Sequence, residues 1–327
     1  MRILGITLGD PGGVGPEIVL KALAGFDFGT DSVPVVFGPK SILTHPFLMP
    51  FLKREFLPWA GRKHVVAGEW YWMDIPLETE LEVGKPNSDN GAVSCRSVEC
   101  AAIHALLEEI DALVTAPISK TSWRMAGVLE SGHTTLLGRL AGDETVSMAF
   151  YTPKLKTILA TVHVPLMKVG SLLTEALLTQ TVDHALLLCE TLGISEPRLA
   201  LAGLNPHAGE GGLFGTEEAS LLIPFAEKMR EKGVDLAGPF PPDVVYRQAY
   251  DGRFDLVVSL YHDQGLIPIK LLAFEEAVNV TVGLPYVRTS PDHGTAFDIA
   301  YTGQASATSI VAAMQLAVRL VTNETSR

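Results

Sequence analysis

Short apolar runs alternate with longer amphipathic segments along most of the chain. The apolar runs are four to six residues long, and their length and composition are typical of buried β-strands. They span residues 3–8, 33–37, 112–115, 157–162, 199–204, 256–260 and 278–282. Segments with apolar residues at helical spacing lie at residues 92–110, 181–192, 217–232 and 306–322. Because strands and helices alternate, we predict an α/β fold.

Length and composition indicate a globular protein. The 327 residues suggest two domains, with one or three still possible. Hydrophobic residues make up 47% and charged residues 19%, which excludes disorder as the main state. No internal repeat, long charge run or Pro/Ser-rich linker marks a boundary, so a discontinuous arrangement stays open.

The charge balance argues against general nucleic-acid binding. The chain has 25 basic and 37 acidic residues, and its net charge of −12 repels a polyanion. A small phosphorylated or carboxylated ligand is still compatible with this charge where a few cations converge. The sequence shows no cleavable apolar leader, no uncharged run long enough to span a membrane, and no CxxC spacing among its three cysteines. We therefore expect a soluble, cytoplasmic protein with no membrane partner.

Three histidines directly follow apolar runs. They are His163 in LATVHVPL, His207 in LAGLNPHAGEGG and His262 in LVVSLYHDQG. Neutral imidazole is a common ligand of divalent transition metals, and three protein ligands leave coordination positions open for catalysis. Each histidine alone is more often a hydrogen-bonded residue at a strand end. The spacing is not local, so a shared metal site depends on the fold.

Acidic and basic candidates accompany the histidines. Asp263 adjoins His262, and Asp243 lies in the proline-rich GPFPPDVVY, so either carboxylate could accept a proton or orient a metal-bound water. Lys120 in TAPISK, Lys270 in LIPIKLLAF and Arg288 in GLPYVRTSPDHG are the cations that could offset an anionic ligand. Lys270 stands in an apolar stretch, where it either needs an anionic partner or extends to solvent.

Three loops have the composition of ligand-contacting segments. Residues 9–17, GDPGGVGPE, follow the first strand but lack GxGxxG order, so they form either a tight turn or a ligand loop. In residues 131–134, SGHT, Thr134 either caps the following helix or lies at an anion site. Residues 292–300, DHGTAFDIA, resemble the adenosine-side loop of the isocitrate and isopropylmalate dehydrogenases, roughly HGSAPDIA.

The chain resembles the 4-hydroxythreonine-4-phosphate dehydrogenase (PdxA) family over nearly its whole length. The matching segments are GDPGGVGPE, TAPISK, NPHAGEGGLFGTEE, YHDQGLIPIK and NVTVGLPYVRTSPDHGTAFDIA. The resemblance implies that the three histidines bind one divalent metal per active site (Zn, Co, Mg or Mn). It implies NAD or NADP as cofactor. The remaining implied site residues fall into three groups: His133, Thr134, Lys270, Asn279 and Arg288 for the phosphorylated substrate; Asp292, His293, Gly294 and Thr295 for the cofactor; Asp243, Asp263 and Lys120 for catalysis.

The resemblance also implies an architecture. It predicts two α/β/α domains, like those of isocitrate and isopropylmalate dehydrogenases, with the active site in the cleft between them. Residues 1–125 and 286–327 would form the first domain. Residues 126–285 would form the second, with the metal ligands and the contacts of a homodimer whose active sites draw on both subunits.

The implied reaction is the NAD-dependent oxidation of 4-phosphooxy-L-threonine to a 3-oxo acid, which decarboxylates to 3-amino-2-oxopropyl phosphate during pyridoxal 5'-phosphate biosynthesis. Thr135 stands where the family commonly has Glu, so threonate or erythronate 4-phosphate is an alternative substrate. Two other classes remain: a phosphate acyltransferase, which would use coenzyme A and no histidine-bound metal, and a non-catalytic metal-binding protein.

Overall fold

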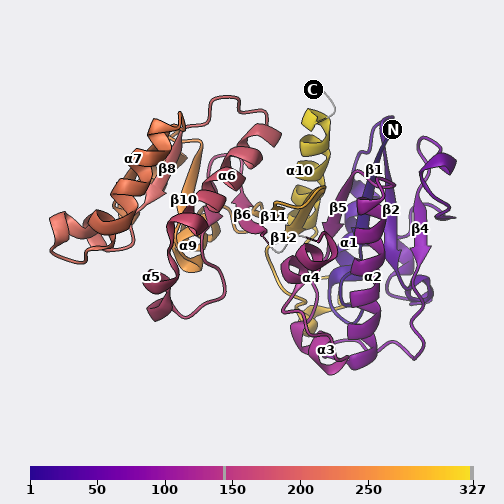
Figure 1. Cartoon of the computed structure of the whole chain (residues 1–327). Helices are drawn as coiled ribbons and strands as arrows, with labels where there is room; N and C mark the ends of the chain where they lie inside the picture. The colour runs from indigo at the N-terminus through magenta and orange to yellow at the C-terminus, as the bar shows by residue number, and fades with distance from the viewer. Residues whose placement is uncertain (143–144, 325–327) are drawn as a thin grey trace. The chain divides into compact units, whose positions relative to one another are not determined.

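The computed structural model describes residues 1–142 and 145–324, which fold into two compact units (Figure 1). Unit 1 consists of Met1–Val146 and Leu284–Arg327, and unit 2 consists of Ser147–Gly283. Each unit combines a β-sheet with packed helices, which confirms the predicted α/β class. No described helix has both the length and the apolarity that a membrane span requires.

The paired strands of unit 1 form a parallel sheet. They are β1 (Arg2–Thr7), β2 (Ser32–Gly38), β3 (Leu57–Pro58), β4 (Tyr71–Asp74), β5 (Ala112–Thr115) and β12 (Val287–Pro291), in the spatial order β3-β4-β2-β1-β5-β12. Every residue of β2 is buried, because successive side chains point to opposite faces and both faces are covered.

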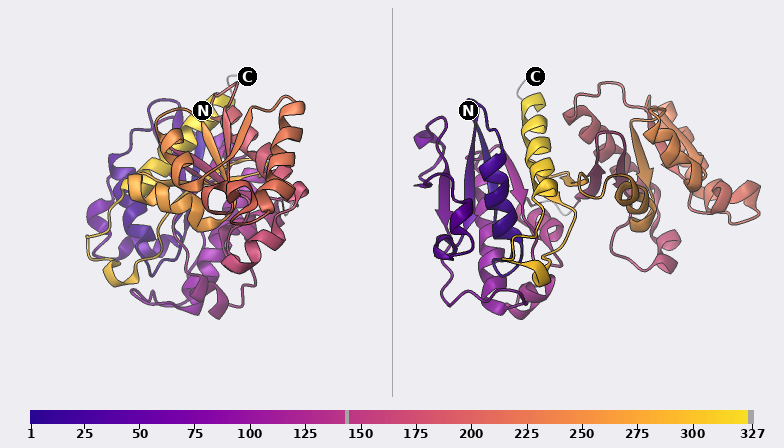
Figure 2. Two further views of the ribbon diagram at one scale, coloured as in Figure 1. Left: turned by 90° about the vertical axis from the view of Figure 1, so that its left-hand side faces the viewer. Right: turned by 180° about the vertical axis from the view of Figure 1, so that it is seen from behind.

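The helices of unit 1 cover this sheet from several segments of the chain (Figure 2). They are α1 (Gly15–Gly25), α2 (Ser88–Leu106), α3 (Lys120–Met125), α4 (His133–Leu140) and α10 (Thr308–Glu324). Helix α2 packs on β1 and β2 and contacts α3 and α4, whereas α10 packs on β5 and β12 and contacts α1. The C-terminal segment therefore completes the unit that the N-terminal segment begins.

The boundary between the units differs from the division expected from the sequence. Residues 126–146, which we expected in the second domain, belong to unit 1. The reason is that α4 packs on α2, and Leu136 and Leu137 are fully buried in the core beside Val98. The second crossing, after Gly283, lies close to the expected boundary at residue 286.

Unit 2 has a mixed sheet. Its strands are β6 (Ser147–Tyr151), β7 (Lys156–Leu159), β8 (Leu199–Ala202), β9 (Leu236–Phe240), β10 (Leu256–Ser259) and β11 (Val278–Val282), in the order β11-β6-β7-β10-β8-β9. Strand β6 is antiparallel to both of its neighbours, and the other pairs are parallel. The helices are α5 (Val169–Leu172), α6 (Glu175–Thr191), α7 (Ile223–Glu231), α8 (Pro242–Tyr250) and α9 (His262–Ala273).

The parallel part of this sheet positions the predicted metal ligands. Strands β7, β10 and β8 are neighbours that run in one direction, so their carboxyl ends lie at one edge. The turns that leave this edge carry His163, His262 and His207 respectively. Strand β9 ends at Phe240 on the same edge and leads to Asp243 in α8. Ligand sites in α/β sheets form at such edges.

Candidate active site

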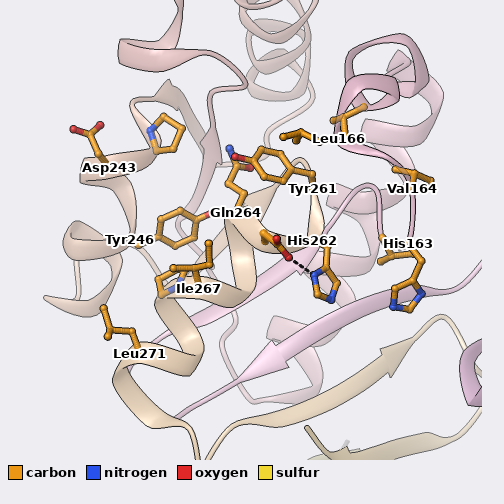
Figure 3. A pocket seen from close by; sticks show the side chains of 15 residues that line it. His163, Val164, Leu166, Asp243, Tyr246, Tyr261, His262, Gln264, Ile267 and Leu271 are labelled. Atoms are coloured by element: carbon orange, nitrogen blue, oxygen red, sulfur yellow. Dashed lines mark hydrogen bonds and ion pairs between the residues drawn. The ribbon is translucent and has the colours of Figure 1, made fainter. Parts of the chain in front are cut away.

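A cavity of about 720 Å³ opens at this edge of unit 2. Its lining includes His163, His262, Asp243, Asp263 and Tyr246 (Figure 3). The four predicted residues among them line one cavity from three separate turns of the sheet. Ligand sites of this kind combine an apolar wall with a few convergent polar groups.

Two of the three predicted metal ligands face each other in this cavity. The ring centroids of His163 and His262 are 5.6 Å apart. The Nδ1 atom of His262 lies 2.7 Å from Oδ1 of Asp263. A carboxylate at Nδ1 fixes the tautomer of the ring and leaves Nε2 available as a ligand atom.

His207 stands on a different turn of unit 2. Its ring contacts Phe214, with the centroids 6.0 Å apart, and its Nδ1 lies 4.0 Å from the Glu210 carboxylate. It does not line the cavity that contains the other two histidines. Within residues 1–142 and 145–324, no three His, Cys, Asp or Glu side chains are gathered closely enough to hold a metal ion. The predicted trio is thus not assembled within one chain.

The acidic and hydroxyl groups of the cavity have distinct environments. Asp243 is exposed in the first turn of α8. Tyr246 is buried one turn later, and its hydroxyl lies 2.8 Å from Oγ of Ser259. Burial raises the pKa of Tyr246, so its phenol stays protonated and is unsuited to accept a proton at neutral pH.

Lys270 and Asn279 lie elsewhere in unit 2. Lys270 is in α9, and its Nζ is 5.8 Å from the centre of the Phe274 ring. The apolar stretch around it forms helix α9, and two of its apolar side chains, Ile267 and Leu271, are 64% and 83% exposed. Asn279 is in β11, where its buried Oδ1 accepts no hydrogen bond from the part of the chain that the structure describes.

Unit 1 contains a buried cation. Arg288 in β12 is only 1% exposed, and its Nη2 donates a hydrogen bond of 2.6 Å to Oγ1 of Thr115, at the end of β5. Burial lowers the pKa of Arg288 to about 10, so the guanidinium is still charged at neutral pH. Burying a positive charge away from water is costly unless nearby groups compensate it.

His133 shares the electrostatic environment of Arg288. Its ring packs edge-to-face on Trp123, and its buried Nε2 has no hydrogen-bond partner among the described residues. Burial lowers the pKa of His133 well below its usual 6.5, and the charges of Arg288 and Lys120 lower the pKa further. The imidazole is therefore neutral beside two cations, which is the environment that an anion would occupy.

Helix α4 begins at His133 rather than after it. The residue before it, Gly132, occupies the N-cap position and makes no side-chain capping bond. Thr134 lies inside the first turn, so the interpretation of Thr134 as the helix cap is wrong. The alternative, that the start of this helix faces an anion, agrees with the unpartnered His133 Nε2.

The predicted cofactor residues form one loop of unit 1. Residues 292–295 follow β12 and pack against the glycine loop at residues 9–17. The backbone N–H of Val14 donates to the carbonyl of Thr295 at 2.9 Å. A Cβ atom at Gly13 would lie 2.9 Å from the Thr295 side chain, so this contact requires glycine. The two loops therefore pack directly against each other.

Comparison with known proteins identifies the family. The family model described as "Pyridoxal phosphate biosynthetic protein PdxA" matches residues 31–317. The chain belongs to the PdxA family. This confirms the family that the sequence motifs predicted.

Members of the PdxA family match over their full length. "D-threonate 4-phosphate dehydrogenase" of Pectobacterium atrosepticum is 40% identical, with 98% of this chain and 99% of the relative aligned. "4-hydroxythreonine-4-phosphate dehydrogenase" of Synechocystis sp. is 43% identical, over 97% and 95% of the two chains. A crystal structure of 4-hydroxythreonine-4-phosphate dehydrogenase from Klebsiella pneumoniae superposes with a TM-score of 0.87 at 36% identity, over 98% and 100% of the chains. Their names agree with the predicted dehydrogenase class.

Sequence reasoning missed the residues that hold the PdxA motifs in place. Thr115, Gln264 and Glu218 make the hydrogen bonds that fix Arg288 and the histidine turns. Gln264 lies two residues after His262, and Glu218 ends the family segment NPHAGEGGLFGTEE. The sequence marked these residues only as polar positions inside the motifs. Because their hydrogen-bond partners lie far away in sequence, their roles could not be predicted from it.

Proposed function

We propose that the chain is an NAD-dependent dehydrogenase that oxidises the carbon-3 hydroxyl of 4-phosphooxy-L-threonine. The product is a 3-oxo acid, which loses carbon dioxide to give 3-amino-2-oxopropyl phosphate in pyridoxal 5'-phosphate biosynthesis. Membership of the PdxA family and the dehydrogenase names of its full-length relatives support this proposal.

The observation that carries the proposal is the buried, positively charged environment around His133 in unit 1. Arg288 and Lys120 are cations beside a neutral His133 whose Nε2 has no partner. A phosphate group would accept hydrogen bonds from these side chains and offset the charge of the buried guanidinium.

The donors in the unit 2 cavity suit a divalent transition metal in their chemistry. Two imidazoles face each other, and a carboxylate orients one of them, which is a recurrent arrangement around zinc. His163 and His262 would hold the ion together with His207, which would come from the other subunit of the proposed homodimer because it stands on a separate turn of this chain. When bound, such an ion would act as a Lewis acid toward the oxygen on carbon 3 of the substrate.

The chain's own groups would manage the protons of the reaction. Oxidation moves a hydride from carbon 3 of the substrate to the nicotinamide and a proton from the hydroxyl oxygen to a base. Asp263 and Asp243 line the cavity and can accept that proton, directly or through water. Lys120 would offset negative charge in unit 1. Residues 292–295 would contact NAD or NADP.

A second substrate is favoured by one residue beside His133. Thr135 is uncharged, and its Oγ1 donates to the carbonyl of Gly132 at 3.0 Å. A carboxylate at this position would favour an ammonium group on the substrate, whereas threonine has no such preference. D-Threonate 4-phosphate has a hydroxyl in place of that ammonium. The relative from Pectobacterium atrosepticum carries this substrate in its name.

The deciding experiment measures NADH formation by metal-loaded protein with 4-phosphooxy-L-threonine, D-threonate 4-phosphate and D-erythronate 4-phosphate in parallel. We expect turnover that chelation abolishes and added zinc or cobalt restores. The ratio of kcat/KM values selects the substrate. Coenzyme A-dependent turnover of an acyl phosphate, with no NADH from any substrate, would identify an acyltransferase instead.

We also propose that the chain forms a homodimer through unit 2. Ile267, Leu271 and Phe274 are 64%, 83% and 64% exposed, and they recur at the three- and four-residue spacing of one face of α9. Met167 adds a 93% exposed side chain in the segment before α5. Contiguous apolar surface of this kind is typical of protein interfaces.

A further inference from the structure

The three histidine turns of unit 2 are linked to one another by buried hydrogen bonds. The carbonyl of Leu260, two residues before His262, accepts from both Oγ1 and N of Thr161, at 2.7 and 3.1 Å. Thr161 lies two residues before His163. The turns that carry His163 and His262 are therefore joined at a single carbonyl.

Gln264 extends this network to the third turn. Its Oε1 accepts from the backbone N–H of Leu260 at 2.6 Å, and its Nε2 donates to the carbonyl of Gly203 at 2.7 Å. The side chain is 6% exposed, so these bonds do not compete with solvent. Gly203 begins the segment that leads to His207, and its own N–H donates to Phe240 at the end of β9.

Glu218 holds the same segment from the opposite side. Its Oε1 accepts from the N–H groups of Leu204 and Asn205, each at 2.8 Å, and its Oε2 accepts from Nδ2 of Asn205 at 2.9 Å. Glu218 is 2% exposed. A buried carboxylate with three such donors is strongly fixed in position.

The backbone after this anchor is strained. Residues 207–211 all have positive φ, including the non-glycine residues His207, Ala208 and Glu210. Each non-glycine residue in this region costs on the order of 1 kcal/mol, and such a turn persists only when its surroundings enforce it. The bonds from Gln264 and Glu218 to residues 203–205 supply that constraint.

We propose that Gln264 is a positioning residue for the metal sites that the two subunits of the proposed dimer would share: within one chain its amide fixes the turn of His207 relative to the turn of His262, and Glu218 transmits this constraint to Asn205. The inference rests on the proposed function for the role of the histidines. The arrangement of the turns rests on the hydrogen bonds alone.

The test compares Gln264→Met with Gln248→Met. Methionine has nearly the volume of glutamine and is likewise uncharged, but it lacks the amide group that makes the hydrogen bonds. Gln248 lies on α8 in the same unit and interacts with Arg253 instead of a histidine turn. Three quantities are measured: cobalt affinity by visible absorption, kcat and KM at saturating cobalt, and backbone hydrogen exchange at residues 203–205.

We expect Gln264→Met to weaken cobalt binding by about 10–100-fold, which is the usual effect of losing a residue that orients a ligand. Its kcat should fall more than its KM rises, and amide exchange at Leu204 and Asn205 should accelerate. Gln248→Met should match the wild type in all three. Cobalt affinity and exchange both within twofold of wild type in Gln264→Met would overturn the proposal.

A second variant covers the case in which Gln264→Met does not fold. Glu218→Gln keeps the side-chain shape but replaces one acceptor oxygen with a donor, so it should also weaken cobalt binding and accelerate exchange at residues 203–205. Should the wild type itself bind no cobalt, the proposed metal site is wrong. The exchange rates then decide alone: faster exchange in the variants supports the positioning role, and unchanged exchange refutes it.

Discussion

Replacing Arg288 with methionine is predicted to remove the response of the fold to phosphate. Burial lowers the pKa of Arg288 to about 10. Since each pKa unit corresponds to about 1.4 kcal/mol, burial opposes the charged side chain by about 3 kcal/mol. A bound phosphate would offset this penalty through charge-assisted hydrogen bonds, whereas methionine has no charge to offset.

The assay is thermal unfolding in a phosphate series, with chloride added to keep the ionic strength constant. A ligand at about 100 times its Kd stabilises the folded state by about 2.7 kcal/mol, so the wild-type Tm should rise with phosphate. Arg288→Met should show no rise. Arg124→Met, at an exposed position of α3, removes the same charge and should keep the wild-type response.

Two results would refute this reasoning. An equal loss of the phosphate response in Arg124→Met would mean that overall charge, rather than Arg288, sets the response. An undiminished response of Arg288→Met to phosphate would place the anion site elsewhere in the chain.

Three further predictions test other parts of the structure. Because the pKa of buried His133 is depressed, the unfolded chain binds more protons than the folded chain below pH 6.5. The free energy of unfolding should therefore fall by up to about 1.4 kcal/mol for each unit by which the pH is lowered in that range. Urea titrations should show a shallower fall in His133→Phe, and equal slopes in the two proteins would contradict the assignment. At Gly209, φ is +82° and a Cβ would meet a carboxylate oxygen at 2.8 Å, so Gly209→Ala should lower the urea midpoint more than Gly211→Ala, which has φ +64° but open space; equal losses would show that the contact is irrelevant. Leu271→Glu should produce monomers in sedimentation, whereas Leu129→Glu, 97% exposed in unit 1, should not, and a stable Leu271→Glu dimer would place the interface elsewhere.

Local sequence patterns predicted much of the fold. Short apolar runs are typical of buried strands, and each of the seven predicted runs overlaps a strand of the structure. Helix ends were less accurate: the segment expected at residues 92–110 forms α2 over Ser88–Leu106. Its start is fixed by Asn87, whose side chain accepts from the N–H groups of Asp89 and Asn90. A capping bond of this kind extends a helix into polar sequence that periodicity does not detect.

The candidate site was predictable in its residues but not in its arrangement. A histidine after an apolar run identifies a strand end, so the placement of His163 and His262 beside one cavity follows from parallel neighbouring strands. The separate position of His207 depends on a left-handed turn that no periodicity encodes. Likewise, the bond between Arg288 and Thr115 joins residues 173 positions apart, and only the folded sheet brings them together.

The most direct test of the proposed reaction follows a label on carbon 3. Each candidate phosphorylated acid is prepared with deuterium at that carbon and incubated with NAD and the metal-loaded protein, and the NADH is examined by mass spectrometry. The account predicts one deuterium in each NADH formed. Unlabelled NADH, or release of the deuterium to water without NADH, would contradict hydride transfer from carbon 3.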